Sequence, residues 1–376
     1  MNEMQVELIN SIKKFCAQNI EPHMEHDDRD EKFRMEIFNQ LGELGLTGIT
    51  LPEEYGGLGL SYVDLCLALE EIAKSSVSYA VTVSVSTMVQ SILNMYGNED
   101  QKKKYLPALT SGEEIGAFCL SESHSGSDAS ALKTTARKTD GGYILNGSKM
   151  WITSGGVAKT YIVMARTGDE GAKGISAFIV RDGMEGFEYG KKEKKMGWRS
   201  SPTRELVFNN CFVPAENLLA QEGKGFTIAM SALDRGRITI GAVAVGLSQR
   251  ALDEAVKYSL ERNQFKQAIF EFQGLQWMMA DMATEVEASR LLTYQAAKEF
   301  DAGKNNVKLA SMAKMKATDT AMKVTTDAVQ IHGGVGYTSE YPVERFMRDA
   351  KVLQIVEGTN QVQKIVIARE LRKHYQ

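Results

Sequence analysis

One carboxylate near the end of the chain stands in surroundings that suit acid–base chemistry. Glu357 follows the mostly apolar segment 352–356 and precedes Gly358 and Thr359. Apolar surroundings disfavour the charged form of a carboxyl group and raise its pKa, so such a Glu can act as a general base near pH 7. Gly358, which has no Cβ, lets the backbone approach a ligand closely. The alternative interpretation is an ordinary helix start with Thr359 or Asn360 as its N-cap.

Two polar segments nearer the middle of the chain could hold a ligand beside that base. Residues 118–128 pass from an apolar strand start into small hydroxyl residues and Gly126, which can offer N–H groups and hydroxyls to an anionic or heteroaromatic ligand. Residues 146–156 contain a Trp-Ile-Thr sequence that ends at Thr153 and precedes two glycines. Such a strand end can lay an aromatic wall and a hydroxyl against a flat ring system. The alternatives are a polar surface loop and a β-hairpin with a buried Trp.

The pattern of apolar residues divides the chain into three regions that would position these segments. Apolar residues recur at helical spacing over residues 1–110, and no proline occurs between Pro214 and Pro342, which suits long helices. Between these regions lie turn signals, among them Asp140-Gly141-Gly142 and Asn146-Gly147, and short β-rich runs at 143–145, 161–164, 175–180, 206–208 and 211–213. We therefore expect a mainly α fold with a β insert: an N-terminal helical domain (1–113), a middle antiparallel β domain (114–218) and a C-terminal antiparallel helix bundle (219–376).

Charge and composition argue against several classes of protein. The net charge of −4 gives no electrostatic reason to expect nucleic acid, and no apolar run approaches the roughly 20 residues of a membrane span. The four cysteines form neither a zinc pattern nor a disulfide framework, and His23 with His26 fits a solvated polar stretch, so no metal is expected. The first residues resemble neither a signal peptide nor a transit peptide. This predicts a cytoplasmic protein, or a mitochondrial-matrix protein if a transit peptide was removed.

Five segments, in this order, resemble the acyl-CoA dehydrogenase family over essentially the whole chain. They are residues 116–128, the Asn-Gly-x-Lys-x-Trp-Ile-Thr-x-Gly segment at 146–155, the Gln-x-x-Gly-Gly-x-Gly-Tyr loop at 330–337, residues 341–351, and Glu357-Gly358-Thr359. The resemblance implies an FAD enzyme that converts a saturated acyl-CoA into trans-2-enoyl-CoA, with the flavin between the β domain and the C-terminal bundle. It also implies a role in fatty acid β-oxidation, electron transfer to an electron-transferring flavoprotein, and a homotetramer built as a dimer of dimers.

The resemblance also implies roles for individual residues. Glu357 would remove the α-proton, the β-hydrogen would leave as hydride to flavin N5, and the Glu357 backbone N–H with a flavin ribityl hydroxyl would hold the thioester carbonyl. The residues implied in FAD binding within one chain are Phe118, Leu120, Ser121, Ser127, Trp151, Ile152, Thr153, Thr359 and Gln361. Those implied in reaching the FAD of a neighbouring subunit are Arg262, Gln264, Phe265, Gln273, Gln330, Gly333 and Gly334. Those implied in substrate binding are Ser127, Asp234, Arg237, Gly358 and Arg369.

Several positions bear on the base and on the substrate. Gly236 stands where some branched-chain relatives carry their catalytic Glu, so the base is assigned to Glu357. The segment 234–237 would reach the pantetheine or would be a solvated helix start, and the lysine-rich segment 191–195 would meet the CoA 3′-phosphate or be a solvated face. Val356 replaces an aromatic residue that often precedes the base, which should widen the pocket for short, medium or branched acyl chains.

Two other functions of the same fold stay open at this point. The same site could run in the opposite direction as an enoyl-CoA reductase. The chain could also be a DNA-binding or otherwise non-dehydrogenase flavoprotein, although a net charge of −4 argues against DNA.

Overall fold

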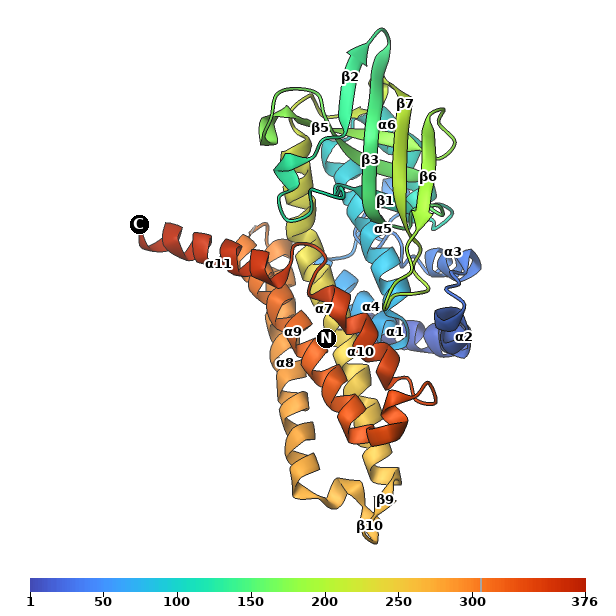
Figure 1. The fold of residues 1–376 in the computed structure, drawn as a ribbon, viewed down its shortest axis with the longest axis vertical. Coiled ribbons are helices and arrows are strands. Elements are labelled where there is room, and N and C mark those ends of the chain that lie inside the picture. Colours follow the sequence, from blue (N-terminus) through green and yellow to red (C-terminus); the bar gives the residue numbers. More distant parts are fainter. Residues whose placement is uncertain (305) are drawn as a thin grey trace.

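The computed structural model describes residues 1–304 and 306–376. The first and last parts of the chain form helices and its middle forms a β-sheet, so the mainly α class with a β insert is confirmed (Figure 1). The helices are α1 (Glu3–Phe15), α2 (Met24–Arg29), α3 (Met35–Glu43), α4 (Tyr62–Ser75), α5 (Val77–Tyr96), α6 (Glu99–Thr110), α7 (Gly225–Glu261), α8 (Gln273–Asp301), α9 (Val307–His332), α10 (Val343–Leu353) and α11 (Asn360–Tyr375).

A mostly antiparallel sheet occupies one end of the molecule, at the top of Figure 1. Hydrogen-bonded neighbours follow the order β6-β7-β3-β2-β4-β5-β8, and β1 pairs in parallel with β4. The strands are β1 (Gly116–Cys119), β2 (Thr135–Thr139), β3 (Gly142–Thr153), β4 (Thr160–Arg166), β5 (Ile175–Arg181), β6 (Phe187–Lys192), β7 (Thr203–Pro214) and β8 (Leu218–Leu219). The antiparallel sheet that the sequence predicts is thereby confirmed, with no βαβ unit inside it.

Two local predictions about the strands are wrong. Asn146-Gly147 does not form a turn but lies inside β3, at a point where the register with β7 shifts. Gly147 has a φ of 139°, and a Cβ there would lie 2.7 Å from Oγ1 of Thr134, so this glycine serves a strand irregularity. Residues 206–208 and 211–213, expected as separate strands, both belong to β7.

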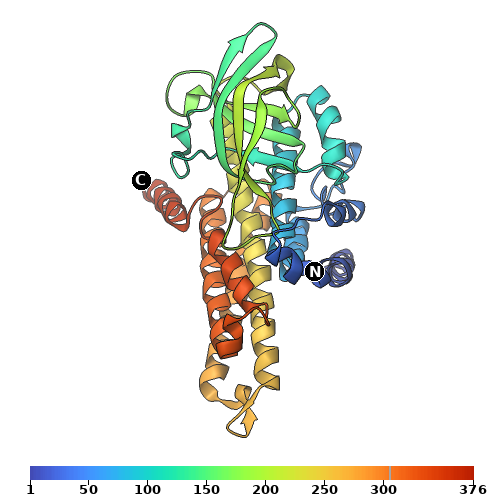
Figure 2. The same cartoon turned by 45° about the vertical axis from the view of Figure 1, so that its right-hand side comes forward.

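The long helix α7 runs from the sheet to the far end of the molecule, with α8 and α9 beside it (Figures 1 and 2). Helix α4 packs closely on α7 because Gly246 has no side chain: a Cβ there would lie 2.1 Å from the carbonyl oxygen of Glu70. Both views show α11 projecting from the body of the molecule. No helix within residues 1–304 and 306–376 is long and apolar enough to cross a membrane.

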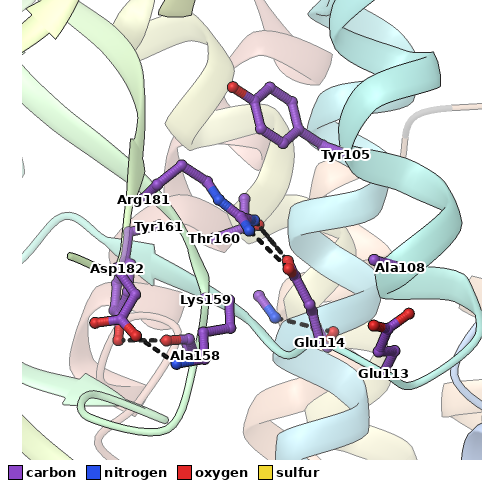
Figure 3. A network of polar contacts seen from close by, with 12 residues as sticks. Tyr105, Ala108, Glu113, Glu114, Ala158, Lys159, Thr160, Tyr161, Arg181 and Asp182 are labelled. Carbon is purple, nitrogen blue, oxygen red and sulfur yellow. Dashed lines mark hydrogen bonds and ion pairs between the residues drawn. The ribbon is translucent and has the colours of Figure 1, made fainter. Parts of the chain in front are cut away.

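A polar network fixes the N-terminal helices to the sheet (Figure 3). Glu114, which follows α6, accepts hydrogen bonds from Nη1 and Nη2 of Arg181 on β5 at 2.5 and 2.6 Å. The guanidinium of Arg181 also lies 5.6 Å from the ring centre of Tyr105 on α6. The hydrogen bond from Arg181 lowers the pKa of Glu114. Because bidentate Arg–carboxylate pairs are geometrically specific, this network sets how α6 meets the sheet and where β1 begins.

Candidate active site

Glu357 lies in a backbone kink between α10 and α11. Its φ is 56° and that of Gly358 is 86°, so two consecutive residues are left-handed. A non-glycine residue costs about 1–3 kcal/mol in such a conformation and needs surrounding structure to hold it there. Thr359 then caps α11 by accepting a hydrogen bond from the N–H of Val362 at 3.2 Å. The interpretation of Thr359 as the N-cap of a helix is therefore confirmed. It is compatible with Glu357, just before that helix, acting as a base.

The carboxyl group of Glu357 packs against the backbone of α7. A Cβ on Gly236 would lie 2.5 Å from Oε2 of Glu357 and 2.6 Å from Cε of Met88 on α5. Oε2 is buried and has no hydrogen-bond partner among the described residues. Burial raises the pKa of Glu357 to about 7, against the opposing charges of Arg237 and Lys314. The pKa is raised as the sequence predicts, but the carboxyl group is enclosed by α7 and α5 rather than by its sequence neighbours, since Ile355 is 52% exposed.

Two side chains that sequence reasoning missed, Gln363 and Lys314, hold the kink by hydrogen bonds to its carbonyl oxygens. The Nε2 atom of Gln363 donates to the carbonyl oxygens of Glu357 and Gly358 at 3.0 and 2.8 Å. The Nζ atom of Lys314 on α9 donates to the same Gly358 oxygen at 3.0 Å and to Oδ1 of Asn360 at 2.8 Å. A lysine within the apolar face of a helix is a signal that could have identified Lys314, since its neighbours at i−4, i+3 and i+7 are all buried alanines.

The segment 234–237 at the side of the kink is less solvated than the alternative interpretation assumed. Arg237 is only 5% exposed, and its Nη1 atom donates to Oδ1 of Asp234 at 2.6 Å. Burial lowers the pKa of Arg237, with the charges of Asp234 and Glu357 opposing that shift. The solvated-helix interpretation is therefore wrong for Arg237. Arg369 on α11 is exposed and pairs with Glu370 at 3.2 Å.

A buried ion pair joins the two polar segments of the sheet region. The Nζ atom of Lys149 on β3 lies 2.7 Å from Oε1 of Glu122, and both side chains are almost fully buried. The same Nζ atom donates to the carbonyl oxygen of Leu120 at 3.1 Å, and the N–H of Met150 donates to that of Ser121 at 2.9 Å. The structure thus brings Leu120 and Ser121 against the strand that ends in Trp-Ile-Thr, as the sequence led us to expect.

Trp151 presents a large aromatic surface beside this joined segment. It is 52% exposed, with a φ of 57°, so the alternative of a β-hairpin with a buried Trp is wrong. Ile152 is buried and Thr153 partly buried next to it, while Phe118 lies partly buried on β1. Ser127 is exposed on the loop that follows. An open aromatic face flanked by hydroxyl residues has the donor chemistry that a flat heteroaromatic ring requires.

Another set of sequence-predicted residues lies at the opposite end of the molecule. These residues are exposed and lie at or next to the ends of the bundle helices. The β9–β10 hairpin (Asn263–Gln264 and Gln267–Ala268) lies at the same end of the molecule, at the bottom of Figure 1. His332 stacks on Tyr258 with ring centres 4.3 Å apart, which holds the end of α9 against α7. The set comprises Arg262, Gln264, Phe265, Gln273, Gln330, Gly333 and Gly334. Within one chain it is remote from the Trp151 segment, so any shared role requires a second subunit.

The lysine-rich segment 191–195 is partly engaged within the chain. Lys192 pairs with Glu31 at 3.3 Å, and Lys195 donates to the carbonyl oxygen of Ser201 at 2.8 Å. Burial lowers the pKa of Lys195 to about 8. Lys191 and Lys194 stay exposed, so the segment is neither uniformly solvated nor wholly free.

Known proteins match the chain along nearly all of its length. Family models for acyl-CoA dehydrogenase match in order: the N-terminal domain over residues 2–113, the middle domain over 117–211 and the C-terminal domain over 223–372. An acyl-CoA dehydrogenase of Bacillus subtilis (strain 168) is 48% identical, over 99% of this chain and 98% of the relative.

Solved structures agree with the sequence comparison. Butyryl-CoA dehydrogenase from Megasphaera elsdenii is 44% identical with a TM-score of 0.97, covering 99% of this chain and 98% of that one. A chain solved in work on the electron transferring flavoprotein of Acidaminococcus fermentans and flavin-based electron bifurcation is 48% identical, also with a TM-score of 0.97 and covering 99% of this chain and 98% of that one.

A helical frame around an antiparallel sheet, with a buried carboxyl group in the bundle and an open aromatic face on the sheet, defines a flavoprotein oxidoreductase. The chain belongs to the acyl-CoA dehydrogenase family. Its cofactor is accordingly FAD, and the half-exposed Trp151 next to the hydrogen-bonded Met150–Ser121 pair offers an aromatic surface that suits a flavin ring. The predicted family, fold, enzyme class and cofactor are all confirmed.

Proposed function

We propose that Glu357 is the general base that removes the α-proton of a short-chain or branched-chain acyl-CoA thioester. The observation that carries this proposal is the buried Oε2 atom of Glu357, which lies beside Gly236 without a hydrogen-bond partner among the described residues. An unpartnered buried carboxyl oxygen is costly for the fold, which is understandable if a substrate hydrogen is its partner. Because burial raises the pKa of this group to about 7, it can both accept and retain a proton near neutral pH.

Neighbouring groups are arranged to orient the thioester toward this oxygen. The backbone N–H of Glu357 donates no hydrogen bond within the described residues, so it is free to bind the thioester carbonyl as charge develops on it. The Asp234–Arg237 pair borders the same kink and is proposed to contact the pantetheine, with Gly358 and Arg369 further along the CoA arm. Val356, which is partly buried and smaller than an aromatic residue, is proposed to widen the acyl pocket beside the base for a branched or medium chain.

Bound FAD supplies the acceptor for the hydride that leaves the β-carbon. We assign its ring to the surface made by Leu120, Ser121 and the Trp-Ile-Thr segment of β3, with Phe118, Ser127, Thr359 and Gln361 as further contacts. The exposed set from Arg262 to Gly334 would complete the flavin site of a neighbouring subunit. This makes assembly part of the proposal, and a dimer of dimers is the form expected.

An electron-transferring flavoprotein is the proposed electron acceptor. The 48% identity to a chain solved in work on the electron transferring flavoprotein of Acidaminococcus fermentans supports it. The 44% identity to butyryl-CoA dehydrogenase supports a short acyl chain. A role in fatty acid β-oxidation and a cytoplasmic location stay predictions.

The test is an anaerobic titration of Glu357→Gln with butyryl-CoA, isobutyryl-CoA and octanoyl-CoA. The variant should keep FAD, yet the visible flavin band should no longer bleach, because the amide cannot take the α-proton. Glu188→Gln, an exposed residue on β6, is the control and should bleach like the wild type. Bleaching of Glu357→Gln at the wild-type rate would show that the base lies elsewhere.

Direction is decided in the same preparation. Reduction of an electron-transferring flavoprotein by butyryl-CoA supports the dehydrogenase. Faster turnover of crotonyl-CoA with a reduced electron donor would instead favour the enoyl-CoA reductase.

A further inference from the structure

A lysine lies at the centre of the bundle, directly beneath the kink that carries Glu357. Lys314 on α9 is fully buried, and its two hydrogen bonds go to the carbonyl oxygen of Gly358 and the amide oxygen of Asn360, at 3.0 and 2.8 Å. Within the described residues, Lys314 forms no ion pair within 4 Å. A buried ammonium group that has only neutral hydrogen-bond partners is costly, because it has lost its hydration without gaining a carboxylate contact.

The charged groups around Lys314 are few and come from different elements. Glu357 in the kink and Asp319 on α9 are the negative groups that favour its protonated form, and Arg237 on α7 opposes it. Asp319 is already engaged, since its Oδ1 accepts hydrogen bonds from Gln354 and Asn360, both at 2.7 Å. Glu357, in contrast, has an oxygen without a partner. The charge of Lys314 is therefore best complemented by Glu357 in its ionised form.

The hydrogen bonds of Lys314 also bear on the backbone that aims the base. Glu357 and Gly358 are both left-handed, and their carbonyl oxygens point toward the side chains of Gln363 and Lys314. Asn360, the first residue of α11, is tied in turn to Thr318 on α9 at 2.9 Å. Lys314 thus links both sides of the kink to one rigid helix.

We propose that Lys314 is a positioning residue that holds the Glu357–Gly358 kink and, as a cation, favours the ionised form of the base. This inference rests on the proposed role of Glu357. Burial lowers the pKa of Lys314 to about 7, and the charge of Glu357 opposes that shift, so ionisation of the base and protonation of the lysine favour each other. The other groups that face Glu357 are Arg237 on α7, whose charge lowers the pKa of Glu357 more than that of Lys314 does, and Tyr62 on α4. Within the described residues, their hydrogen bonds go to Asp234 and to the carbonyl oxygen of Arg235, not to the kink backbone.

The experiment compares Lys314→Met, which removes both charge and donors, with Lys314→Gln, which keeps an amide donor. Without the cation, the pKa of Glu357 rises, so the acidic limb of kcat/KM should move up by about one pH unit in both variants. Activity should then fall about tenfold below pH 7 and recover at pH 9, more completely in Lys314→Gln because its amide can still bind Gly358. FAD content should stay at the wild-type level.

Lys323→Met is the matched control, because Lys323 lies on the same helix but is half exposed and paired with Asp327. It should leave the pH profile unchanged. An acidic limb that stays in place in whichever Lys314 variant folds overturns the inference, as does a uniform loss of activity at all pH values. If Glu357→Gln retains activity, the proposed base itself is wrong, so the two failures are distinguishable.

Discussion

Replacing Gly236 with alanine should disable the enzyme with little effect on folding. A Cβ at this position would lie 2.5 Å from Oε2 of Glu357 and 2.6 Å from Cε of Met88. Carbon and oxygen atoms rarely approach closer than about 3.4 Å, so the carboxyl oxygen must move by about 1 Å. A displacement of that size at a reacting group costs about 10²-fold in rate, or roughly 2.7 kcal/mol of transition-state stabilisation.

The free energy of unfolding should change much less than the rate. Alanine is about 1 kcal/mol better than glycine inside a helix, and this gain offsets part of the roughly 1–3 kcal/mol that overpacking costs. Both displaced atoms are the ends of flexible side chains, which can give way without moving the backbone. We therefore expect a melting temperature close to that of the wild type and full FAD content.

The assay is kcat for butyryl-CoA with an artificial electron acceptor, measured beside thermal unfolding. Gly241→Ala is the control: it lies on the same helix, and its Cβ would meet only the side chain of Thr293, at 3.0 Å and beyond. Its activity should stay within about twofold of the wild type, since Glu357 is untouched. A Gly236→Ala enzyme with undiminished kcat would refute the reasoning, because the carboxyl position would then not be fixed by α7.

Three further predictions concern charge. Because the pKa of Glu357 is about 7, kcat/KM should rise steeply from pH 6 to 7 and level off above pH 8; a flat profile would contradict the assigned base. The pKa of Glu357 is higher in the folded than in the unfolded chain, so its contribution to stability is complete only below the pKa of the unfolded state and is lost as the pH rises through 7. The melting temperature of Glu357→Gln should therefore exceed that of the wild type at pH 8 but not at pH 4. Lys149→Met should leave the buried Glu122 carboxylate without its ion-pair partner, which lowers the free energy of unfolding by about 3–5 kcal/mol and releases FAD on gel filtration. Adding Glu122→Gln to this variant should restore part of the stability and part of the FAD content. If Lys149→Met kept as much flavin absorbance per chain as the wild type, the predicted loss of FAD would be contradicted.

The sequence was sufficient for the order of the helical and β regions, whereas the roles of the site residues stay predictions. Glu357 could be found because its flanks are apolar, but the groups that enclose its carboxyl oxygen, Gly236 and Met88, lie on other helices and could not be. Its left-handed backbone could not be found, because that conformation is imposed by contacts with α9. Asn146-Gly147 misled because the same dipeptide serves both hairpin turns and strand irregularities, and only the pairing of β3 with β7 decides between them.

Other features depend on partners that one segment of sequence does not contain. Strand β2 has a single buried residue and no apolar alternation, so it exists because β3 pairs with it. Phe265 is 87% exposed in one chain, and its predicted role requires a second chain. Lys314 is one of several lysines on its helix, and its burial becomes visible only when its position on the alanine-lined face is considered.

Helix α7 carries the substrate-side residues near its start and ends where the residues assigned to a neighbouring subunit begin. Gly236 and Arg262 are 26 positions apart, which at 1.5 Å per residue places them about 39 Å from each other. If the proposed flavin assignments hold, this helix sets the distance between the site of its own subunit and that of a neighbouring subunit. Deleting one residue from the helix would shorten it by only about 1.5 Å but would rotate the residues beyond the deletion by about 100° around the helix axis. The rotational position of the residues, more than the length of the helix, is therefore what must be preserved.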